Sequence, residues 1–561
     1  MVNWESKKLT DYLGLGILLA TLSLLGLFGN DYFFRLDLTE EKRYTLSPTT
    51  ENLLEETTEE IYVELYLDGD LPPGFIRLRK AIIETLEEFK HQSASGLTYR
   101  IIDPNKTSSE RARNEFIQKL AEKGIPPTDV FATENAQQVQ RRVFPGAIVT
   151  YRGEEVGVNF LKGGRMGSAE EALNQSIEGV EYELAAAIQQ LSRPAKKRIG
   201  IVQGHNEWDS LDIAGLTGLL NDRYDVFRMR LSDRPKVIGF DALIVAGPKD
   251  KFTEADKYKL DQFLMSGGKL LFFLNSLYVN MDSATNAEQN NFAIAVDLNL
   301  DDLLFKYGVR INGNYIQDIN SGFYPVVTGN FGDRPDIRLM PWPFYPVINN
   351  FANHPTVRNL DAVWTRFVSS MDTVRADGIK KHLLLMTSPY TRVITAPAQV
   401  RINDVRDLTP SDFQSGTKAV GYLLEGSFSS LFKNRFLPDL VDTTEFRGDG
   451  FPSQVLVVAD GDFVRNEKSV QTNQAFPVGF DPYDNQQFAN GDFIINVLQY
   501  MLDEQNLILA RNKTVQIRPL DRVKAEQEKT LWQVLNIALP LFFVLIFGVV
   551  WQLFYRAKYR R

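Results

Sequence analysis

The sequence contains no cysteine among its 561 residues. This absence excludes disulfide bonds, thiolate metal sites and a cysteine nucleophile, and it is compatible with either an oxidising or a reducing compartment. Histidine is also scarce, with four residues in the whole chain. The chain has no block of basic or acidic residues either. Its net charge of −9 is spread over the full length, which argues against nucleic acid as the main partner.

The sequence also lacks a nucleotide-binding loop. The glycine-rich stretch LKGGRMGS at 161–168 has no Lys-Ser or Lys-Thr pair after a glycine at the spacing of a phosphate-binding loop, and no dinucleotide-binding glycine pattern occurs. We interpret it as a connection before a helix. A process driven by ATP would therefore take its energy from another subunit.

Two long uncharged stretches predict membrane-spanning helices at 12–30 and 530–555. The first has a competing interpretation as a cleaved signal peptide, because two lysines precede it, but no small-x-small cleavage site follows. The second carries aromatic residues near its ends, where rings prefer the membrane interface. Its tail, 556–561, is basic and contains no acid, which favours a cytoplasmic C-terminus. Two spans then place both termini in the cytoplasm and some 500 residues outside.

The predicted spans also limit the function. Neither contains an ionisable residue, so two such helices offer no ion path, and the chain would need a partner permease to act in transport. Gly16 and Ala20, four residues apart, form a small-xxx-small face that is a candidate for packing on another helix. Pro540 is a candidate kink in the second span, or is simply tolerated there.

Residues 31–194 predict a small α/β domain. Apolar residues at 75, 78, 82, 86 and 89 form one face of a helix, and Arg152-Gly153 predicts the turn of a hairpin. Ser47 before Pro48 predicts a helix start, and Ser168 with Glu171 has the spacing of a capping box. The resulting order, βαβαββα, is similar to a thioredoxin-like fold. Without cysteine the redox pair is missing, so the domain would be a scaffold.

Residues 195–510 predict a second, doubly wound α/β domain, because buried strands alternate with helices from 198 to 274. We expect it to be glutamine-amidotransferase-like, with a long insertion at about 285–450. The insertion includes PWPFYP at 341–346, whose aromatic rings either stack on a sugar or peptide ligand or pack on the core. The full predicted organisation is a cytoplasmic N-terminus at 1–11, spans at 12–30 and 530–555, periplasmic domains at 31–194 and 195–510, a juxtamembrane segment at 511–529 and a cytoplasmic tail at 556–561.

Five polar residues follow strands of the second domain. They are predicted to share the sheet edge where doubly wound folds hold ligands, and they are His205, Glu207, Asn275, Asp460 and Asp462. One interpretation is a metal site, since imidazole and carboxylate are good ligands. A second is a hydrolase in which Ser276 is the nucleophile, although the sequence identifies no base for it. A third is structural, with the aspartates as turn and capping residues. We predict no catalytic residue and no metal, and treat these five residues as a candidate ligand-binding or degenerate site.

Several stretches together resemble one family. They occur in order along almost the whole chain, and they are LDLTEEKRYTLSPTT, GHNE, GGKLLFFLNS, LLLMTSPYTRV, YLLEGSFSSLFKNRF, VLVVADGDFV, NGDFIINVLQYML and LNIALPLFFVLIFGVVW. The family is GldG, the exported auxiliary subunit of ABC transporters associated with gliding motility in Bacteroidetes. The resemblance implies an inner-membrane protein with a large periplasmic part that acts with a separate multi-span permease and a cytoplasmic ATPase. It implies no catalytic residues.

We therefore predict a non-enzymatic auxiliary subunit of an ABC transporter that needs no cofactor. Its predicted partners are the permease, the ATPase and the lipid bilayer, with no nucleic acid, and association into a homo-oligomer stays open. The alternative is a receptor that binds a glycan, lipid or peptide for the transporter. A membrane-tethered hydrolase is the third hypothesis.

Overall fold

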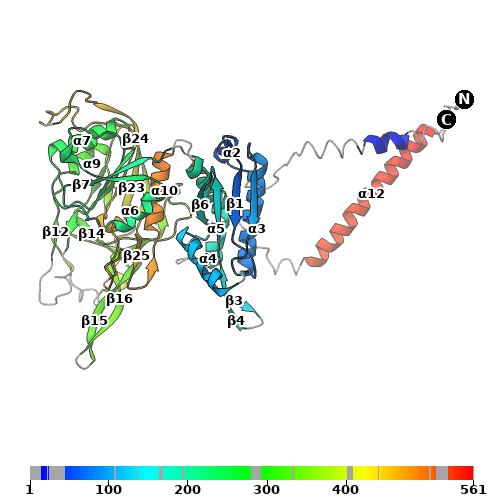
Figure 1. The fold of residues 1–561 in the computed structure, drawn as a ribbon, viewed down its shortest axis with the longest axis horizontal. Helices are drawn as coiled ribbons and strands as arrows, with labels where there is room; N and C mark the ends of the chain where they lie inside the picture. Colours follow the sequence, from blue (N-terminus) through cyan, green and yellow to red (C-terminus); the bar gives the residue numbers. More distant parts are fainter. Residues whose placement is uncertain are drawn as a thin grey trace. The chain divides into compact units, whose positions relative to one another are not determined.

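A computed structural model describes residues 14–21, 23, 45–106, 109–134, 137–162, 169–192, 195–279, 292–331, 334–400, 408–439, 441–469, 471–503, 507–512 and 528–559. The chain forms two compact units, Met1–Thr514 and Val515–Arg561. The larger unit contains two main sheets (Figure 1). One hydrophobic core belongs to the four-stranded sheet, and two others lie on the two faces of the eight-stranded sheet.

The first sheet has four strands in the order β2-β1-β5-β6, with β1 parallel to β2 and antiparallel to β5. The hairpin of β3 and β4 lies outside it and was not predicted. The elements of this part are α2 (Pro48–Glu55), β1 (Ile61–Leu65), α3 (Pro73–Gln92), β2 (Leu97–Ile101), α4 (Glu110–Glu122), β3 (Thr128–Glu134), β4 (Gln137–Val143), β5 (Gly146–Tyr151), β6 (Glu154–Asn159) and α5 (Ala169–Ser192).

Local sequence signals explain these elements. The five apolar residues predicted to form one face of α3 are all buried, as amphipathic spacing requires. Arg152 and Gly153 both have positive φ, of 53° and 78°, which suits the tight turn between β5 and β6. Ser47 caps α2, since its side chain accepts a hydrogen bond from the Thr50 N–H. These three predictions are confirmed, whereas Ser168 of the predicted capping box lies outside the described residues.

The second sheet has eight strands in the order β17-β20-β23-β24-β10-β9-β7-β8. The run from β8 to β24 is parallel, and β23, β20 and β17 continue it in antiparallel pairings. The elements are β7 (Arg198–Gln203), α6 (Ala214–Asn221), β8 (Asp225–Arg230), β9 (Ala242–Ala246), α7 (Glu254–Met265), β10 (Lys269–Phe273), α9 (Asp301–Tyr307), β17 (Asn350–Phe351), β20 (Ile379–Met386), β23 (Ala419–Ser429), β24 (Asp449–Val458) and α10 (Asn490–Leu502).

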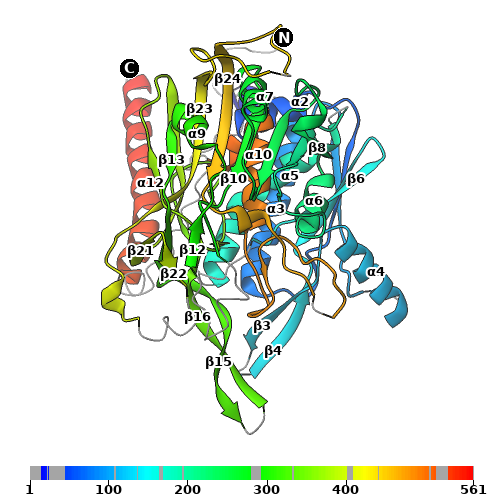
Figure 2. The ribbon, with the colours of Figure 1, turned by 90° about the vertical axis from the view of Figure 1, so that its left-hand side faces the viewer.

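Helices cover both faces of this sheet (Figure 2). Alternate residues of β9 enter two different cores: Ile244 packs with α6 and α10, whereas Val245 packs with α7 and α9. Because each face is covered, the central strands are apolar at nearly every position, as parallel sheets require. The predicted alternation of strands and helices between 198 and 274 is therefore confirmed.

The range predicted as an insertion contributes strands to the main sheet. Strands β17, β20 and β23 fall within 285–450: β23 pairs with β24, β20 with β23, and β17 with β20, so only part of that range lies outside the sheet. The remainder forms small sheets and a ribbon of β15 and β16 that projects from them (Figures 1 and 2). These elements are β11 (Leu277–Tyr278), β12 (Phe292–Ala295), β13 (Val309–Ile311), β14 (Asn314–Asp318), β15 (Ser321–Phe331), β16 (Arg334–Ile348), β18 (Val363–Trp364), β19 (Met371–Thr373), β21 (Thr391–Thr395) and β22 (Ala398–Gln399).

The aromatic residues of PWPFYP lie inside this part of the molecule. Trp342, Phe344 and Tyr345 are all buried and pack with Tyr315, Trp364 and Phe367 in one cluster. The ring centroids of neighbouring pairs in the cluster lie 5.3 to 6.2 Å apart, in the tilted or edge-to-face arrangements that aromatic rings prefer. The structure thus matches the packing interpretation of this motif.

Helix α7 carries buried charged residues. Asp261 is fully buried and accepts hydrogen bonds from the Tyr307 hydroxyl at 3.0 Å, the Leu431 N–H at 3.0 Å and the Ser430 hydroxyl at 2.6 Å. Burial raises the pKa of Asp261 and outweighs these hydrogen bonds, which favour the ionised form. The carboxyl group therefore ties α7 to α9 and to the chain after β23.

The smaller unit contains helix α12 (Lys529–Tyr559). Within it, Lys529–Ala557 is long and apolar enough to cross a membrane, with a mean hydropathy of 2.5 over its most apolar window and none of that window buried. Pro540 lies inside this continuous helix.

Of the predicted span 12–30, residues 14–21 and 23 are helical, and the rest lies outside the described residues. Gly16 and Ala20 lie in that segment and are exposed, so their predicted role in helix packing stays a prediction.

Candidate functional site

A cavity of about 290 Å³ lies at the carboxyl ends of the parallel strands. Residues that follow four of these strands reach it: Trp208 after β7, Lys249 after β9, Asn275 after β10 and Asp462 after β24. This is the sheet edge at which the sequence predicted a site. We call it the Trp208 cavity, and its lining residues are Trp208, Pro248, Lys249, Asn275, Leu277, Tyr278, Val279, Val296, Tyr315, Tyr345, Arg366, Phe367, Asp462 and Arg465.

Three of the five predicted residues meet at this edge. The Asn275 amide donates to the Asp462 carboxylate at 3.2 Å and accepts from the Gly461 N–H at 2.7 Å. Asp460 caps the short helix at Gly461–Val464, where it accepts the Asp462 N–H at 2.8 Å. The aspartates of the Asp-Gly-Asp turn therefore fix a loop that Asn275 joins to the neighbouring strand.

Asp460 also accepts a hydrogen bond from the main chain of Arg366, a residue that lines the cavity. Its carboxyl group is fully buried and accepts the Arg366 N–H at 2.8 Å. Burial and the nearby charge of Asp462 raise the pKa of Asp460, although both backbone hydrogen bonds oppose that rise. Asp460 is absent from the lining of the Trp208 cavity. It supports the cavity wall from behind and presents no oxygen to a ligand.

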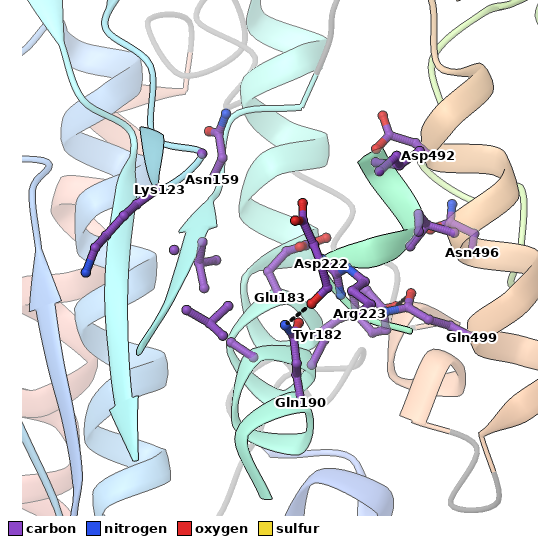
Figure 3. Close-up of a pocket in the computed structure, with 18 of the residues that line it drawn as sticks. Lys123, Asn159, Tyr182, Glu183, Gln190, Asp222, Arg223, Asp492, Asn496 and Gln499 are labelled. Carbon is purple, nitrogen blue, oxygen red and sulfur yellow. Dashed lines mark hydrogen bonds between the residues drawn. The ribbon is translucent and has the colours of Figure 1, made fainter. Parts of the chain in front are cut away.

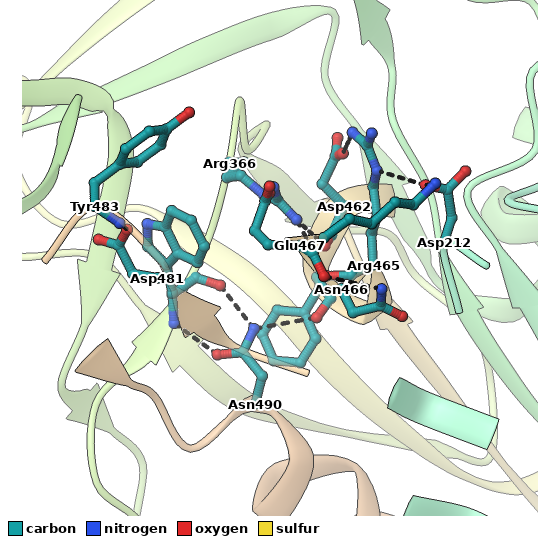
Figure 4. A network of polar contacts seen from close by, with 12 residues as sticks. Asp212, Arg366, Asp462, Arg465, Asn466, Glu467, Asp481, Tyr483 and Asn490 are labelled. Atoms are coloured by element: carbon teal, nitrogen blue, oxygen red, sulfur yellow. Dashed lines mark hydrogen bonds and ion pairs between the residues drawn. The ribbon is translucent and has the colours of Figure 1, made fainter. Parts of the chain in front are cut away.

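Arg366 and Arg465 line the cavity, and each belongs to a network of hydrogen bonds and ion pairs with acidic residues (Figure 4). The Arg366 guanidinium binds the Glu467 carboxylate and donates to the main-chain carbonyls of Asp462 and Arg465, each at 3.2 Å. Arg465 lies 3.3 Å from the Asp462 carboxylate and 3.5 Å from that of Asp212. Neither arginine was predicted: Arg366 reaches the edge through contacts with residues about a hundred positions away, whereas Arg465 directly follows the short helix at Gly461–Val464.

The other two predicted residues form a separate cluster. The Glu207 carboxylate accepts the His205 N–H at 2.8 Å and lies 3.1 Å from His205 Nδ1, whereas His205 Nε2 lies 3.2 Å from the Asp256 carboxylate. The imidazole also stacks on Phe252, with ring centroids 3.7 Å apart. Burial disfavours the charged ring, but the hydrogen bonds to Asp256 and Glu207 prevail and raise the pKa of His205 to about 9.

The sequence analysis missed Asp256, although a signal for it exists. Thr253 and Asp256 have the spacing of a capping pair at the start of α7, and the Thr253 hydroxyl accepts the Asp256 N–H at 3.1 Å. The Asp256 carboxylate contacts that hydroxyl at 2.7 Å and His205. The cluster thereby joins the loop after β7 to the start of α7.

This geometry does not fit the metal interpretation. Both ring nitrogens of His205 face carboxylates, and an imidazolium ion has no lone pair to give a metal. Among the residues that the structure describes, no group of three or more potential ligands is arranged to hold an ion. The four residues considered for a metal are instead divided between two structural clusters.

The hydrolase interpretation also lacks its geometry. The Ser276 hydroxyl donates to the Asn312 carbonyl at 2.9 Å and lies 2.7 Å from the Ser369 hydroxyl. Neither partner is a base, so the described contacts of Ser276 do not make it a nucleophile.

A larger cavity, of about 570 Å³, lies among β6, α5, α6 and α10 (Figure 3). Its lining includes the largely buried Glu183, which pairs with Lys162 at 2.7 Å and Arg511 at 3.3 Å. Burial alone would raise the pKa of Glu183, but these two cations lower it. No sequence motif marks this cavity.

Comparisons with known proteins give limited further information on fold. An uncharacterised protein of Borreliella burgdorferi is 24% identical over 417 residues, covering 72% of this chain and 75% of that protein. The N-terminal domain of mmIFT52 covers 55% of this chain at 14% identity, and 98% of that structure is matched. A putative ThuA-like protein from Parabacteroides merdae covers 58% at 12% identity, with 94% of it matched. With TM-scores of 0.29 and 0.26, neither likeness carries an argument.

Two family models match the chain. Residues 40–150 match a domain of unknown function, DUF7088. Residues 196–497, more than half of the chain, match a family described as ABC-type uncharacterized transport system, and they include the eight-stranded sheet and the Trp208 cavity. The chain therefore belongs to this ABC-type transport system family, as an auxiliary component.

Proposed function

We propose that this chain is a non-enzymatic, membrane-anchored auxiliary subunit of an ABC transporter of the gliding-motility kind, acting with a separate permease and ATPase. The observation that carries the proposal is the apolar helix Lys529–Ala557, fully exposed within its own unit, in a chain of an ABC-type transport system family. An exposed face of this length and composition requires lipid or other apolar helices around it.

The proposed arrangement anchors the chain at both ends. Spans at 12–30 and 530–555 place both termini in the cytoplasm and residues 31–510 in the periplasm, with a thioredoxin-like domain followed by an amidotransferase-like one. The cytoplasmic ATPase drives the permease, and the two spans transmit that motion to the periplasmic part or hold it in place. The proposed contacts with the partner subunits are the two spans together with the adjoining segments 31–45 and 515–530.

The contacts of the candidate residues support a non-enzymatic role. His205 has both ring nitrogens against carboxylates, and Ser276 contacts a carbonyl and a second hydroxyl. A general base needs a free lone pair within reach of the proton that it removes, and a serine nucleophile needs such a base beside it. These residues therefore support structure better than they support hydrolysis.

Purification of the tagged full chain from its native host under mild detergent tests the complex. We expect a multi-span permease and a P-loop ATPase to be recovered with it. Leu545→Arg puts a charge near the middle of α12 and should reduce recovery in the membrane fraction, since such a charge costs roughly 3 kcal/mol there. Leu437→Arg, on a partly exposed loop, is the matched control. Recovery of the chain without either partner would refute the proposal.

The absence of cysteine makes the proposed orientation directly testable. Single substitutions Asp250→Cys and Arg561→Cys each introduce the only thiol in the chain. A membrane-impermeant thiol reagent should label Asp250→Cys in spheroplasts and Arg561→Cys only after lysis. The reverse labelling pattern would contradict the proposed orientation. It would not affect the proposed association with a permease, which the purification tests separately.

A further inference from the structure

We propose that the Trp208 cavity binds a small ligand with an anionic oxygen head, a carboxylate or a phosphate, on an apolar body. This goes beyond the auxiliary role, and its test needs neither the permease nor the ATPase. One cavity combines an unpaired buried donor, a cation without a carboxylate partner among the described residues, and a partly apolar wall.

The first observation is the Tyr315 hydroxyl. Tyr315 is fully buried and lines the cavity, yet its hydroxyl has no hydrogen-bond partner among the described residues. A buried hydroxyl left without a partner costs about 1–3 kcal/mol, so such groups are normally satisfied. Its ring is fixed by Phe344 and Phe367, with centroids 6.2 and 5.3 Å away. The hydroxyl is thus held in place as a donor for a ligand oxygen.

The second observation is the charge at the cavity wall. The lining residues include three cations, Lys249, Arg366 and Arg465, and the single acid Asp462. The arginines are paired as described above. Lys249 Nζ, in contrast, lies 4.0 Å from the centroid of the Trp208 ring and has no carboxylate partner within the parts of the chain that the structure describes. Because Glu467 pairs with Arg366, and Asp462 and Asp212 pair with Arg465, the unbalanced charge at this wall is that of Lys249.

Trp208 holds these cations in position. Its ring lies beneath Lys249 and also beneath the Arg465 guanidinium, at 4.4 Å, while its indole N–H donates to the Gly461 carbonyl at 2.7 Å. Contact with an aromatic face stabilises a cation without neutralising it. Arg465 is already paired with Asp462 and Asp212, so Lys249 is the cation on this ring that is left to attract an anion, among the described residues.

One part of the lining suits the apolar body of a ligand. Leu277, Val279, Val296 and Phe367 provide hydrocarbon surface, and Tyr345 adds an aromatic wall. Polar groups contribute the larger share of the accessible wall, so a ligand would meet hydrocarbon along only part of its surface. At about 290 Å³ the cavity lies at the small end of ligand pockets, so it suits a molecule the size of an aryl or short alkyl acid.

Calorimetric titration of the full chain in detergent micelles tests the head group. The probes are phenylacetate, phenyl phosphate, inorganic phosphate and the uncharged phenylacetamide. We expect saturable binding of phenylacetate or phenyl phosphate at millimolar concentration or below, and the tighter of the two identifies the head. Inorganic phosphate and phenylacetamide should each bind at least about tenfold more weakly, because one lacks the apolar body and the other the charge.

Three variants locate the binding. Lys249→Met keeps the apolar stem and removes the charge, and it should weaken the better aryl probe roughly tenfold. Tyr315→Phe removes only the hydroxyl, and it should weaken the probe about fivefold or more while leaving the ligand-free melting temperature unchanged or higher. Lys251→Met is the matched control, since this exposed lysine pairs with Asp297 and does not line the cavity.

Several outcomes would overturn the inference. These are the absence of saturable binding by both aryl anions, equal binding of phenylacetamide, and affinities that Lys249→Met and Tyr315→Phe leave unchanged. A ligand-free protein destabilised by Tyr315→Phe would show that the hydroxyl is already satisfied, and would equally count against it. None of these results bears on whether the chain associates with a permease.

Discussion

His205 should make the stability of this protein depend on pH in the alkaline range. The hydrogen bonds to Asp256 and Glu207 raise the pKa of its ring from the usual 6.5 to about 9. The stabilisation from this cluster is therefore fully present below pH 6.5 and is lost as the pH rises through about 9. The shift corresponds to roughly 3 kcal/mol, and we expect about half of that because solvent screens part of the interaction.

Urea denaturation of the full chain and of His205→Gln, each measured below pH 6.5 and above pH 9, tests this reasoning. The difference in free energy of unfolding between the two proteins should shrink by roughly 1.5 kcal/mol at the higher pH. Histidine-selective isotope labelling gives a direct readout, because the chain has four histidines. The reasoning would be refuted by a His205 ring that titrates near 6.5, or by a difference that does not change with pH.

Three further predictions concern stability. Gly247→Ala should destabilise the protein by about 1–3 kcal/mol in urea denaturation, because φ is positive there and a Cβ atom would clash with Trp208, whereas Gly218→Ala within α6 meets open space and should be neutral or stabilising. Asp261→Ala should cost about 3–5 kcal/mol by leaving buried donors unpaired, and Asp261→Asn should cost much less in the same assay. Burial lowers the pKa of His354 to about 4, so acid denaturation should show a loss of stability between pH 6.5 and 4 that His354→Gln reduces.

Helix faces and turns were predictable because their signals are local. The apolar spacing in α3 and the capping serine before α2 depend on neighbours within a few residues, and both predictions are confirmed. The alternation of strands and helices from 198 to 274 was also predictable from local sequence. Strands that are covered on both faces are continuously apolar, which marks them in the sequence. The hairpin of β3 and β4 escaped prediction because its strands, TDVFATE and QQVQRRV, have no such continuous apolar run.

The sequence predicted the location of the candidate site, at the carboxyl edge of the sheet, but not which side chains contact one another there. Parallel strands end at the same edge, so His205, Asn275 and Asp462 were expected to be neighbours. The structure joins Asn275 to Asp462 and turns His205 toward Asp256, because the direction of a side chain depends on which helix packs beside the loop. Sequence position alone does not give that direction.

The sequence by itself determined the lack of thiol chemistry, the two long apolar stretches, the amphipathic helix faces and the alternation of strands and helices between 198 and 274. Tertiary structure alone decided that β20 and β23 complete the main sheet and that Tyr315, Arg366 and Lys249 meet at one cavity. The physical reason is the range of the interactions. Helix spacing and capping act over one or two turns, whereas β10 and β24 pair across 185 positions and Arg366 and Glu467 pair across 101.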